Sequence, residues 1–159
     1  MILDQDLQLS NAQAITATAL STNTVDLQAI RDMAAGNPIF FVLTITETFN
    51  ALTALTFQVV TDSQATLATH VVQSQIANIQ LSTGELAADR PPYTLPLGGA
   101  DFETWATTNL RFGKRYLGAR YVVAGTAPSS GAVSCHISLH PPSLRHYAAG
   151  YPTTGVAGD

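Results

Sequence analysis

Two segments between residues 115 and 140 alternate between apolar and polar or small side chains, and this period of two constrains the fold most strongly. The alternating apolar positions are Leu117, Ala119, Tyr121 and Val123 in the first segment, and Val133, Cys135, Ile137 and Leu139 in the second. A β-strand with one face in a core requires this period. Gly125, Pro128 and Gly131 lie between the two segments and favour a chain reversal. We therefore expect two strands joined as a hairpin.

A second pair of alternating segments lies at residues 39–46 and 55–60, with a turn expected around Asn50. Weaker strand patterns follow near residues 67–73 and 76–81, and a short one lies near residues 93–97. The chain shows no repeated strand–helix alternation. Seven or eight short strands joined by hairpins predict an all-β, antiparallel β-sandwich, and a count of eight favours a jelly roll.

The ends of the chain lack the strand pattern of the middle. Residues 9–27 are small and rich in Thr and Ala, which favours an extended arm that ends in a strand. A short helix is expected from Asp26, as its N-cap, to Gly36. Residues 84–109 are expected to form a long loop around one short strand. The prediction is one jelly-roll domain over residues 1–159, with an N-terminal arm (1–22), a sandwich (23–140) and a C-terminal tail (141–159).

The composition predicts a surface that is poor in charge. Only 11% of the residues are charged and twenty are Thr, whereas soluble domains usually carry about 25% charged residues. A surface with so few charges does little to prevent association with other proteins, so we expect partners to cover part of it. The acids and bases are also unevenly placed: residues 1–85 carry seven acids and one base, and residues 86–159 carry four acids and six bases. This asymmetry is consistent with docking on a patterned surface.

Several classes of protein are disfavoured. The N-terminus lacks the apolar segment of a signal peptide, and no apolar run approaches the roughly 20 residues that span a bilayer. We expect a soluble protein made in a cytoplasm, with no membrane partner. A single cysteine excludes an intrachain disulfide.

The His and Cys residues near the end of the chain invite a search for a metal or nucleophilic site. On a strand, His136 and His140 would lie roughly 13 Å apart, too far to share one metal ion. Cys135 and His136 are neighbours on a strand and therefore point to opposite faces, which excludes a catalytic pair. The sequence predicts a buried structural Cys135, a solvent-facing His136, and no metal, cofactor or catalytic residue.

Two further groupings could bind a ligand. Asp101 and Glu103 near Trp105 would suit a carbohydrate site, although solvated acids beside a buried Trp are more common. A basic and aromatic mixture could contact nucleic acid or a protein partner: Arg111, Phe112, Lys114, Arg115, Tyr116, Arg120 and Tyr121. The acidic balance of the chain favours a solvated face or a protein interface over direct binding of nucleic acid.

Three segments together resemble the capsid cement, or decoration, proteins of tailed phages. They are LSNAQAITATALSTNTVDL (9–27), TITETFNALTALTFQVVTDS (44–63) and KRYLGARYVVAGTAPSSGAVSC (114–135), which cover somewhat under half of the chain. The resemblance implies a jelly-roll protein without catalytic residues or cofactors. It also implies binding, as a dimer or trimer, to the major capsid protein on the outside of an icosahedral head, where neighbouring capsomers are tied together against the pressure of packaged DNA.

In such a role, the termini would become ordered on the capsid and extend the contact. The residues expected at the partner interface are Arg111, Lys114, Arg115, Tyr147, Tyr151 and Pro152. Two alternatives remain open: another minor structural component of the virion, and a carbohydrate-binding β-sandwich module.

Overall fold

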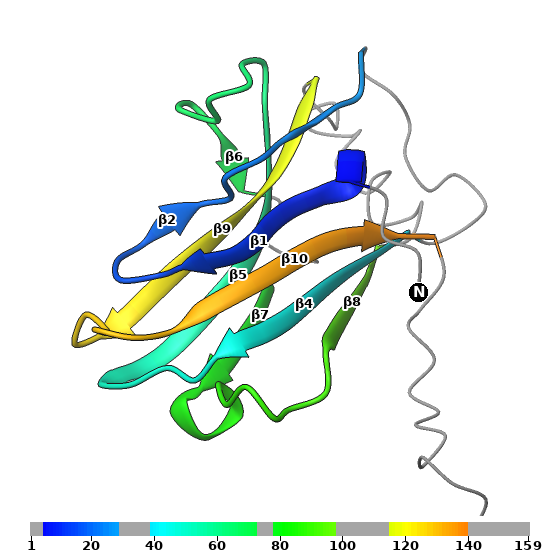
Figure 1. Ribbon diagram of the computed structural model, residues 1–159. Coiled ribbons are helices and arrows are strands. Elements are labelled where there is room, and N and C mark those ends of the chain that lie inside the picture. Colours follow the sequence, from blue (N-terminus) through cyan, green and yellow to red (C-terminus); the bar gives the residue numbers. More distant parts are fainter. Residues whose placement is uncertain (1–4, 29–38, 73–77, 98–114, 140–159) are drawn as a thin grey trace, which may run out of the picture.

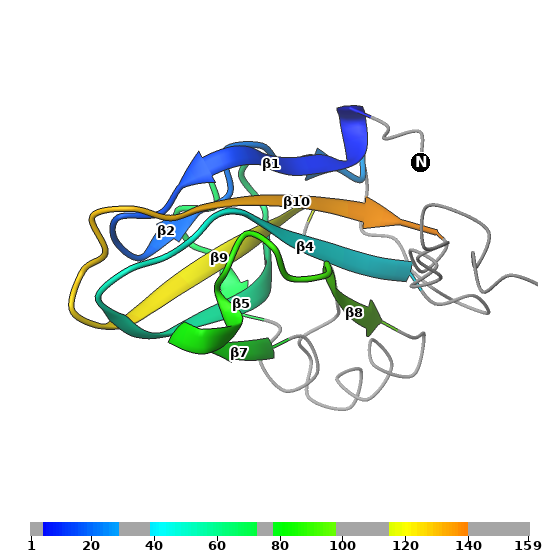
Figure 2. The ribbon, with the colours of Figure 1, turned by 60° about the horizontal axis from the view of Figure 1, so that its bottom comes forward.

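Two antiparallel β-sheets packed face to face make up the protein in a computed structural model (Figures 1 and 2). The structure describes residues 5–28, 39–72, 78–97 and 115–139. Within these ranges the helical residues are two short 3-10 turns, η1 (Gln5–Leu7) and η2 (Thr83–Glu85). The predicted all-β sandwich is confirmed.

The sheets are built around two central strands each. The first sheet has the order β1 (Gln8–Ala14), β10 (Ala132–Ser138), β4 (Ile39–Glu47) and β8 (Tyr93–Leu97). In the second sheet β9 (Tyr116–Gly125) and β5 (Leu52–Asp62) are central. The short strands β2 (Ala19–Leu20) and β3 (Val25–Asp26) pair with β9, whereas β6 (Val71–Val72) and β7 (Asn78–Ser82) pair with β5. We call these the β4–β10 sheet and the β5–β9 sheet.

The path of the chain between these sheets is that of a jelly roll. With β2 and β3 taken as one interrupted strand, and β6 and β7 as another, each sheet contains four strand positions. The chain crosses from one sheet to the other at every connection except the one from β5 to β6 and β7. This alternation produces the nested Greek keys of a jelly roll. The predicted jelly roll is confirmed, and β8 has the predicted bounds.

The two predicted hairpins are wrong in their pairing, although their strands form. β9 pairs with β5, while β10 pairs with β1 and β4. Likewise β4 and β5 are consecutive in the chain but belong to opposite sheets. An alternating segment, a turn and a second alternating segment have the same sequence pattern whether the second strand pairs beside the first or crosses to the facing sheet. The turn residues fix only the reversal of direction.

The predicted N-terminal arm is corrected from residue 8 onward, because these residues belong to the sandwich. β1 pairs with β10, and Leu9 and Ile15 are completely buried in the core. A polar network adds to this attachment. Ser10 Oγ lies 2.7 Å from both Tyr121 Oη and Gln13 Oε1, and the Gln13 Nε2 donates to the Leu20 carbonyl at 2.7 Å. The edge strand is therefore held by buried side chains as well as by its ladder.

The predicted helix from Asp26 to Gly36 does not begin at Asp26. Asp26 is the last residue of β3, and Gln28 has a φ of 61°, outside the helical region. The Asp26 carboxylate does accept a hydrogen bond from the Gln28 N–H at 2.7 Å, as an N-cap side chain would. Residues 29–36 lie outside the described residues.

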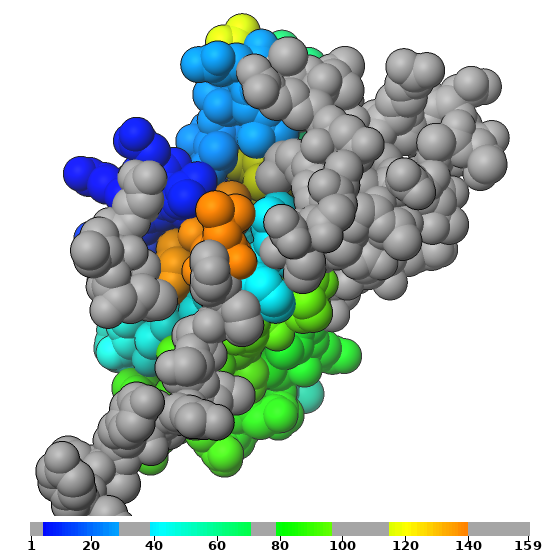
Figure 3. Space-filling view, turned by 90° about the vertical axis from the view of Figure 1, so that its right-hand side faces the viewer, coloured from blue at the N-terminus to red at the C-terminus, as the bar shows by residue number. Residues whose placement is uncertain are grey.

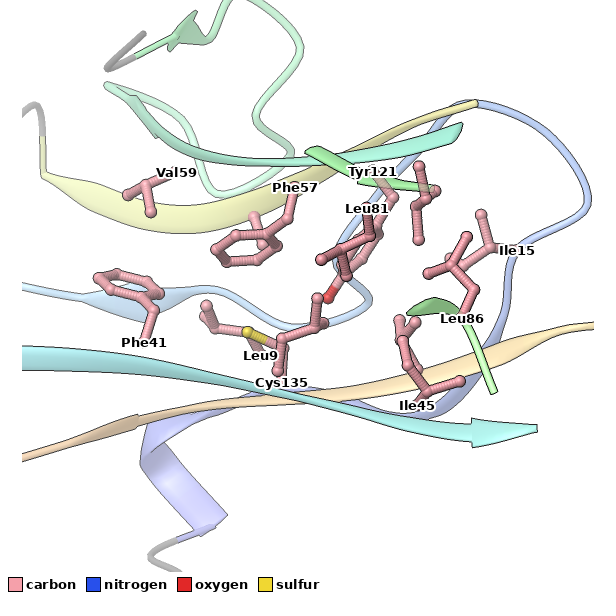
Figure 4. Close-up of a cluster of buried hydrophobic side chains, with 14 of the residues drawn as sticks. Leu9, Ile15, Phe41, Ile45, Phe57, Val59, Leu81, Leu86, Tyr121 and Cys135 are labelled. Atoms are coloured by element: carbon pink, nitrogen blue, oxygen red, sulfur yellow. The ribbon is translucent and has the colours of Figure 1, made fainter. Parts of the chain in front are cut away.

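Alternate side chains from both sheets meet in one apolar core (Figure 4). Phe57 lies at its centre, with ring centroids 6.2 Å from Phe41 and 5.9 Å from Tyr121. The predicted core positions that are buried are Leu117, Ala119, Tyr121, Val133, Cys135 and Ile137. Leu139 is an exception at 67% exposure, because it follows the end of β10. The space-filling view shows β10, in orange, between β1, in dark blue, and β4, in cyan (Figure 3).

Candidate functional site

A metal-binding cluster is absent from the described residues. No group of three or more His, Cys, Asp or Glu side chains in these ranges could hold a metal ion. No helix among them is long and apolar enough to cross a membrane. Cys135 is completely buried, and this burial raises the pKa of its thiol to about 12. The thiol is therefore neutral and structural, as predicted.

Arg115 is the predicted interface residue that the structure describes, and it is engaged within the chain. Its guanidinium donates to both oxygens of Asp26, with Nε–Oδ1 and Nη2–Oδ2 distances of 2.8 and 2.7 Å. The hydrogen bonds from Arg115 lower the pKa of Asp26 to about 2. The guanidinium carbon also lies 5.1 Å from the centroid of the Tyr116 ring. Arg115 therefore fastens β3 to the start of β9.

Of the basic and aromatic mixture, the structure also describes Tyr116, Arg120 and Tyr121, and Tyr121 is completely buried. Most of the other predicted interface and ligand residues lie outside the described residues. They are Arg111, Lys114, Tyr147, Tyr151 and Pro152 for the interface, Asp101, Glu103 and Trp105 for the carbohydrate site, and His140 for the metal pair. The structure therefore does not show the predicted interface, carbohydrate site or metal pair assembled from its residues. The candidate surface described below contains Arg120 from that mixture, and the pairing of distant strands brings its other residues beside Arg120.

His136 corrects the prediction of a solvent-facing imidazole. It points away from the core, opposite Cys135, but its side chain is only 7% exposed. Its Nε2 is buried and has no hydrogen-bond partner. Across the sheet it is paired with Gln8 and Val42, and Val42 is completely buried. The centre of the outer face of the β4–β10 sheet is thus shielded from solvent, which an alternating pattern alone does not reveal.

This burial predicts an acid-sensitive step in stability. Burial lowers the pKa of His136 below its ordinary value of 6.5. The unfolded chain therefore takes up a proton before the folded chain as the pH falls, and the free energy of unfolding decreases below about pH 6.5. We expect His136→Leu to remove this part of the pH dependence and to keep the stability at pH 7.5. Urea unfolding at pH 7.5 and 5.0 measures the stability and its pH dependence. An unchanged pH dependence in the variant would contradict the assignment of this step to His136.

The outer surface of the β5–β9 sheet carries a group of partly exposed side chains around Arg120. Cross-strand register places Leu20, Arg120 and Gln58 in one row, and Val122, Thr56 and Gln80 in the next. Five of the six are partly buried and Gln80 is exposed. Among these six side chains, Arg120 alone is charged. We call them the Arg120 face.

A loop covers the other half of the same outer surface. Leu67 is 1% exposed, and a Cβ added at Gly118 would overlap its Cδ1. Glycine at 118 therefore leaves the space in which Leu67 packs on β9. The Asp62 carboxylate holds this loop: it accepts hydrogen bonds from the Thr69 N–H at 2.7 Å and the Gln64 N–H at 3.2 Å. The covered half ends at Gly118, and the open half begins two residues later at Arg120.

The connections at one end of the sandwich are fixed to one another. The Asn50 Oδ1 accepts hydrogen bonds from the N–H groups of Ser129 and Ser130, at 2.9 and 3.1 Å. These contacts join the β4–β5 connection to the β9–β10 connection, which lie together at the left of Figure 1. The Thr83 hydroxyl adds η2 to this group by donating to the Leu52 carbonyl at 2.6 Å. Hydrogen bonds from small polar residues thus join the connections at this end of the sandwich.

The two sheets and the path of the chain between them define a jelly-roll protein. A model of the Bbp16 family matches residues 9–137 and so spans nearly the whole sandwich, from β1 to β10. The chain belongs to the Bbp16 family. A comparison with curated proteins finds no match.

Proposed function

We propose that this protein is a non-enzymatic capsid cement protein that binds the outer surface of an icosahedral phage head. Its partners are the major capsid protein and further copies of itself, as a dimer or trimer. It needs no cofactor and contacts neither nucleic acid nor a membrane directly. It ties neighbouring capsomers together against the pressure of the packaged DNA, and it is made in the host cytoplasm.

The observation that carries the proposal is the spatial arrangement of the three segments that resemble cement proteins. Residues 9–27 include β2 and β3, which pair with β9, and most of β1, which pairs with β10. Residues 44–63 include β5, which pairs with β9 along nearly its whole length. Residues 114–135 contain β9 and the start of β10. The three segments are far apart in the sequence but lie together in the structure. This is expected if their resemblance to cement proteins reflects a common fold.

The physical properties of the sandwich suit the proposed role. Its two sheets and fixed end present a pre-formed surface, so binding costs little conformational entropy there. One contact patch of about 800 Å² per partner gives only moderate affinity. An oligomer that touches several capsomers gains effective concentration, because release requires all contacts to open together. Many weak contacts of this kind can reinforce a shell without any catalytic group.

The proposal is tested by the amount of this protein in purified, DNA-filled particles. We expect a simple mass ratio to the major capsid protein, corresponding to hundreds of copies per particle, and loss of DNA-filled heads when the protein is stripped off. Re-addition of purified protein to the stripped heads before they rupture is the control. A few copies per particle would place the protein at a vertex or in the tail instead, and its absence from particles would reject a virion role.

A further inference from the structure

The Arg120 guanidinium has unused hydrogen-bonding capacity at the centre of a sheet. Arg120 lies on β9, a central strand, and its side chain is partly exposed. Its Nη1 donates to Gln58 Oε1 at 3.4 Å, a long contact with a neutral amide. Guanidinium has five N–H donors and its strongest partners are carboxylates. Arg115 shows the contrast within the same chain, since both oxygens of Asp26 accept its hydrogen bonds.

No carboxylate of the described residues satisfies Arg120. The ion pair within these ranges joins Arg115 to Asp26, and Asp62, the acid on the same outer surface, is buried and bonded to its own loop. The nearest cross-strand neighbours, Leu20 and Gln58, are uncharged. Arg120 therefore remains a cation available to a partner.

The surroundings of Arg120 match the composition of a protein interface. Interface centres are depleted in Lys, Asp and Glu and enriched in Arg, and the arginine is surrounded by neutral contacts that exclude water. The Arg120 face has this arrangement, with leucine, valine, threonine and glutamine around one arginine. The loop that holds Leu67 stands beside it over Gly118 and would shield one side of a bound group.

We propose that the Arg120 face docks a different protein that presents a carboxylate flanked by uncharged side chains. A second copy seated face to face about a twofold axis would bring two Arg120 guanidiniums together, which like-charge repulsion opposes. Nucleic acid requires a basic stripe rather than one arginine on a neutral face. The identification of the partner as the capsid surface rests on the proposed function.

Binding of purified protein to heads that lack it tests this assignment. Variants Arg120→Glu and Arg120→Gln are compared with the wild type and with Arg90→Glu, which reverses an exposed charge whose Nη2 donates a hydrogen bond to the Gly84 carbonyl at 3.1 Å. Loss of one partner of a desolvated charge pair costs at least about 2 kcal/mol, or about 30-fold in affinity. We expect at least that loss for Arg120→Glu, a smaller loss for Arg120→Gln, and unchanged binding for Arg90→Glu.

The outcomes separate the two proposals. Wild-type protein that does not bind heads rejects the capsid role and, with it, the partner proposed for Arg120. Wild-type binding with equal binding by Arg120→Glu rejects the Arg120 assignment alone. Sedimentation of the wild type and of Arg120→Glu measures self-association. If the wild type self-associates and Arg120→Glu does not, the Arg120 face binds a second copy and the proposal is overturned. Equal melting temperatures of the variants establish that a binding loss does not come from unfolding.

Discussion

Phe57→Ala is expected to lower the free energy of unfolding by about 3–5 kcal/mol, the range for large-to-small substitutions of a buried aromatic residue. Phe57 is 1% exposed and bridges the two sheets: its ring lies between Phe41 of β4 and Tyr121 of β9. Truncation removes both ring contacts and leaves a cavity that Phe41 and Tyr121 cannot fill without leaving their own positions. Urea unfolding followed by the fluorescence or circular dichroism signal measures the loss.

Thr56→Ala on the same strand is the matched control. Thr56 precedes Phe57 and points to the outer surface, where it is partly exposed. Its substitution should change the free energy of unfolding by no more than about 0.5 kcal/mol. If Phe57→Ala also cost less than about 1 kcal/mol, the two sheets would not share the core described above.

The period of two is sufficient to predict β4, β5, β9 and β10, because it reports directly which side chains face a core. Leu117, Ala119 and Tyr121 alternate in the sequence and are all buried in the structure. The same reasoning placed Cys135 in the core, and the structure agrees. Strand pairing required more than the period, because jelly-roll connections cross between sheets and leave no local signal that distinguishes them from hairpins.

The sequence predicts an arm at the N-terminus, where the structure has β1, because the side chains there are small. Threonine and alanine carry little apolar area, so residues 9–22 lack a clear alternation. Their attachment depends on partners over 100 residues away in the sequence, such as the contact between Ser10 and Tyr121. Tertiary hydrogen bonds of this kind cannot be inferred from a single strand pattern.

The candidate surface can be predicted only in part from the sequence, because it too depends on contacts between residues far apart in the chain. Arg120 belongs to the basic and aromatic mixture, but its neighbours along the chain do not show that no carboxylate of the described residues pairs with it. Arg115, in the same mixture, does have such a partner in Asp26, which is 89 residues away. The pairing of β3 with β9 brings Asp26 close to Arg115, whereas the cross-strand partners of Arg120 are the uncharged Leu20 and Gln58, so the assignment required the fold.

Asp62→Ala is expected to release the loop that covers the other half of the β5–β9 sheet and to lower the free energy of unfolding by about 2–3 kcal/mol. Hydrogen bonds to a charged group contribute about 1.5–3 kcal/mol. Asp62 is completely buried, and its two oxygens receive the Thr69 N–H at 2.7 Å and the Thr69 hydroxyl at 3.0 and 3.2 Å. Without these contacts, Leu67 loses the loop geometry that places it over Gly118.

The pH dependence identifies the carboxylate as the cause. Burial alone would raise the pKa of Asp62, but hydrogen bonds from Gln64, Thr69 and Ser63 outweigh it and hold the pKa below the usual 3.8. The folded chain therefore binds this proton less readily than the unfolded chain. The contribution to stability is complete above about pH 4 and is lost as the pH falls through the lowered value.

Urea unfolding at pH 7 and pH 3 tests this account, with the exposed Asp89→Ala as the control. We expect Asp62→Ala to lose stability at pH 7 and to differ less from the wild type at pH 3. Amide hydrogen exchange at Thr69 locates the effect, because its N–H is protected by the Asp62 oxygen in the wild type. A variant with wild-type stability at pH 7 and an equally slow Thr69 exchange would show that the loop is held by Leu67 packing alone. The carboxylate would then have no structural role in the outer surface of this sheet.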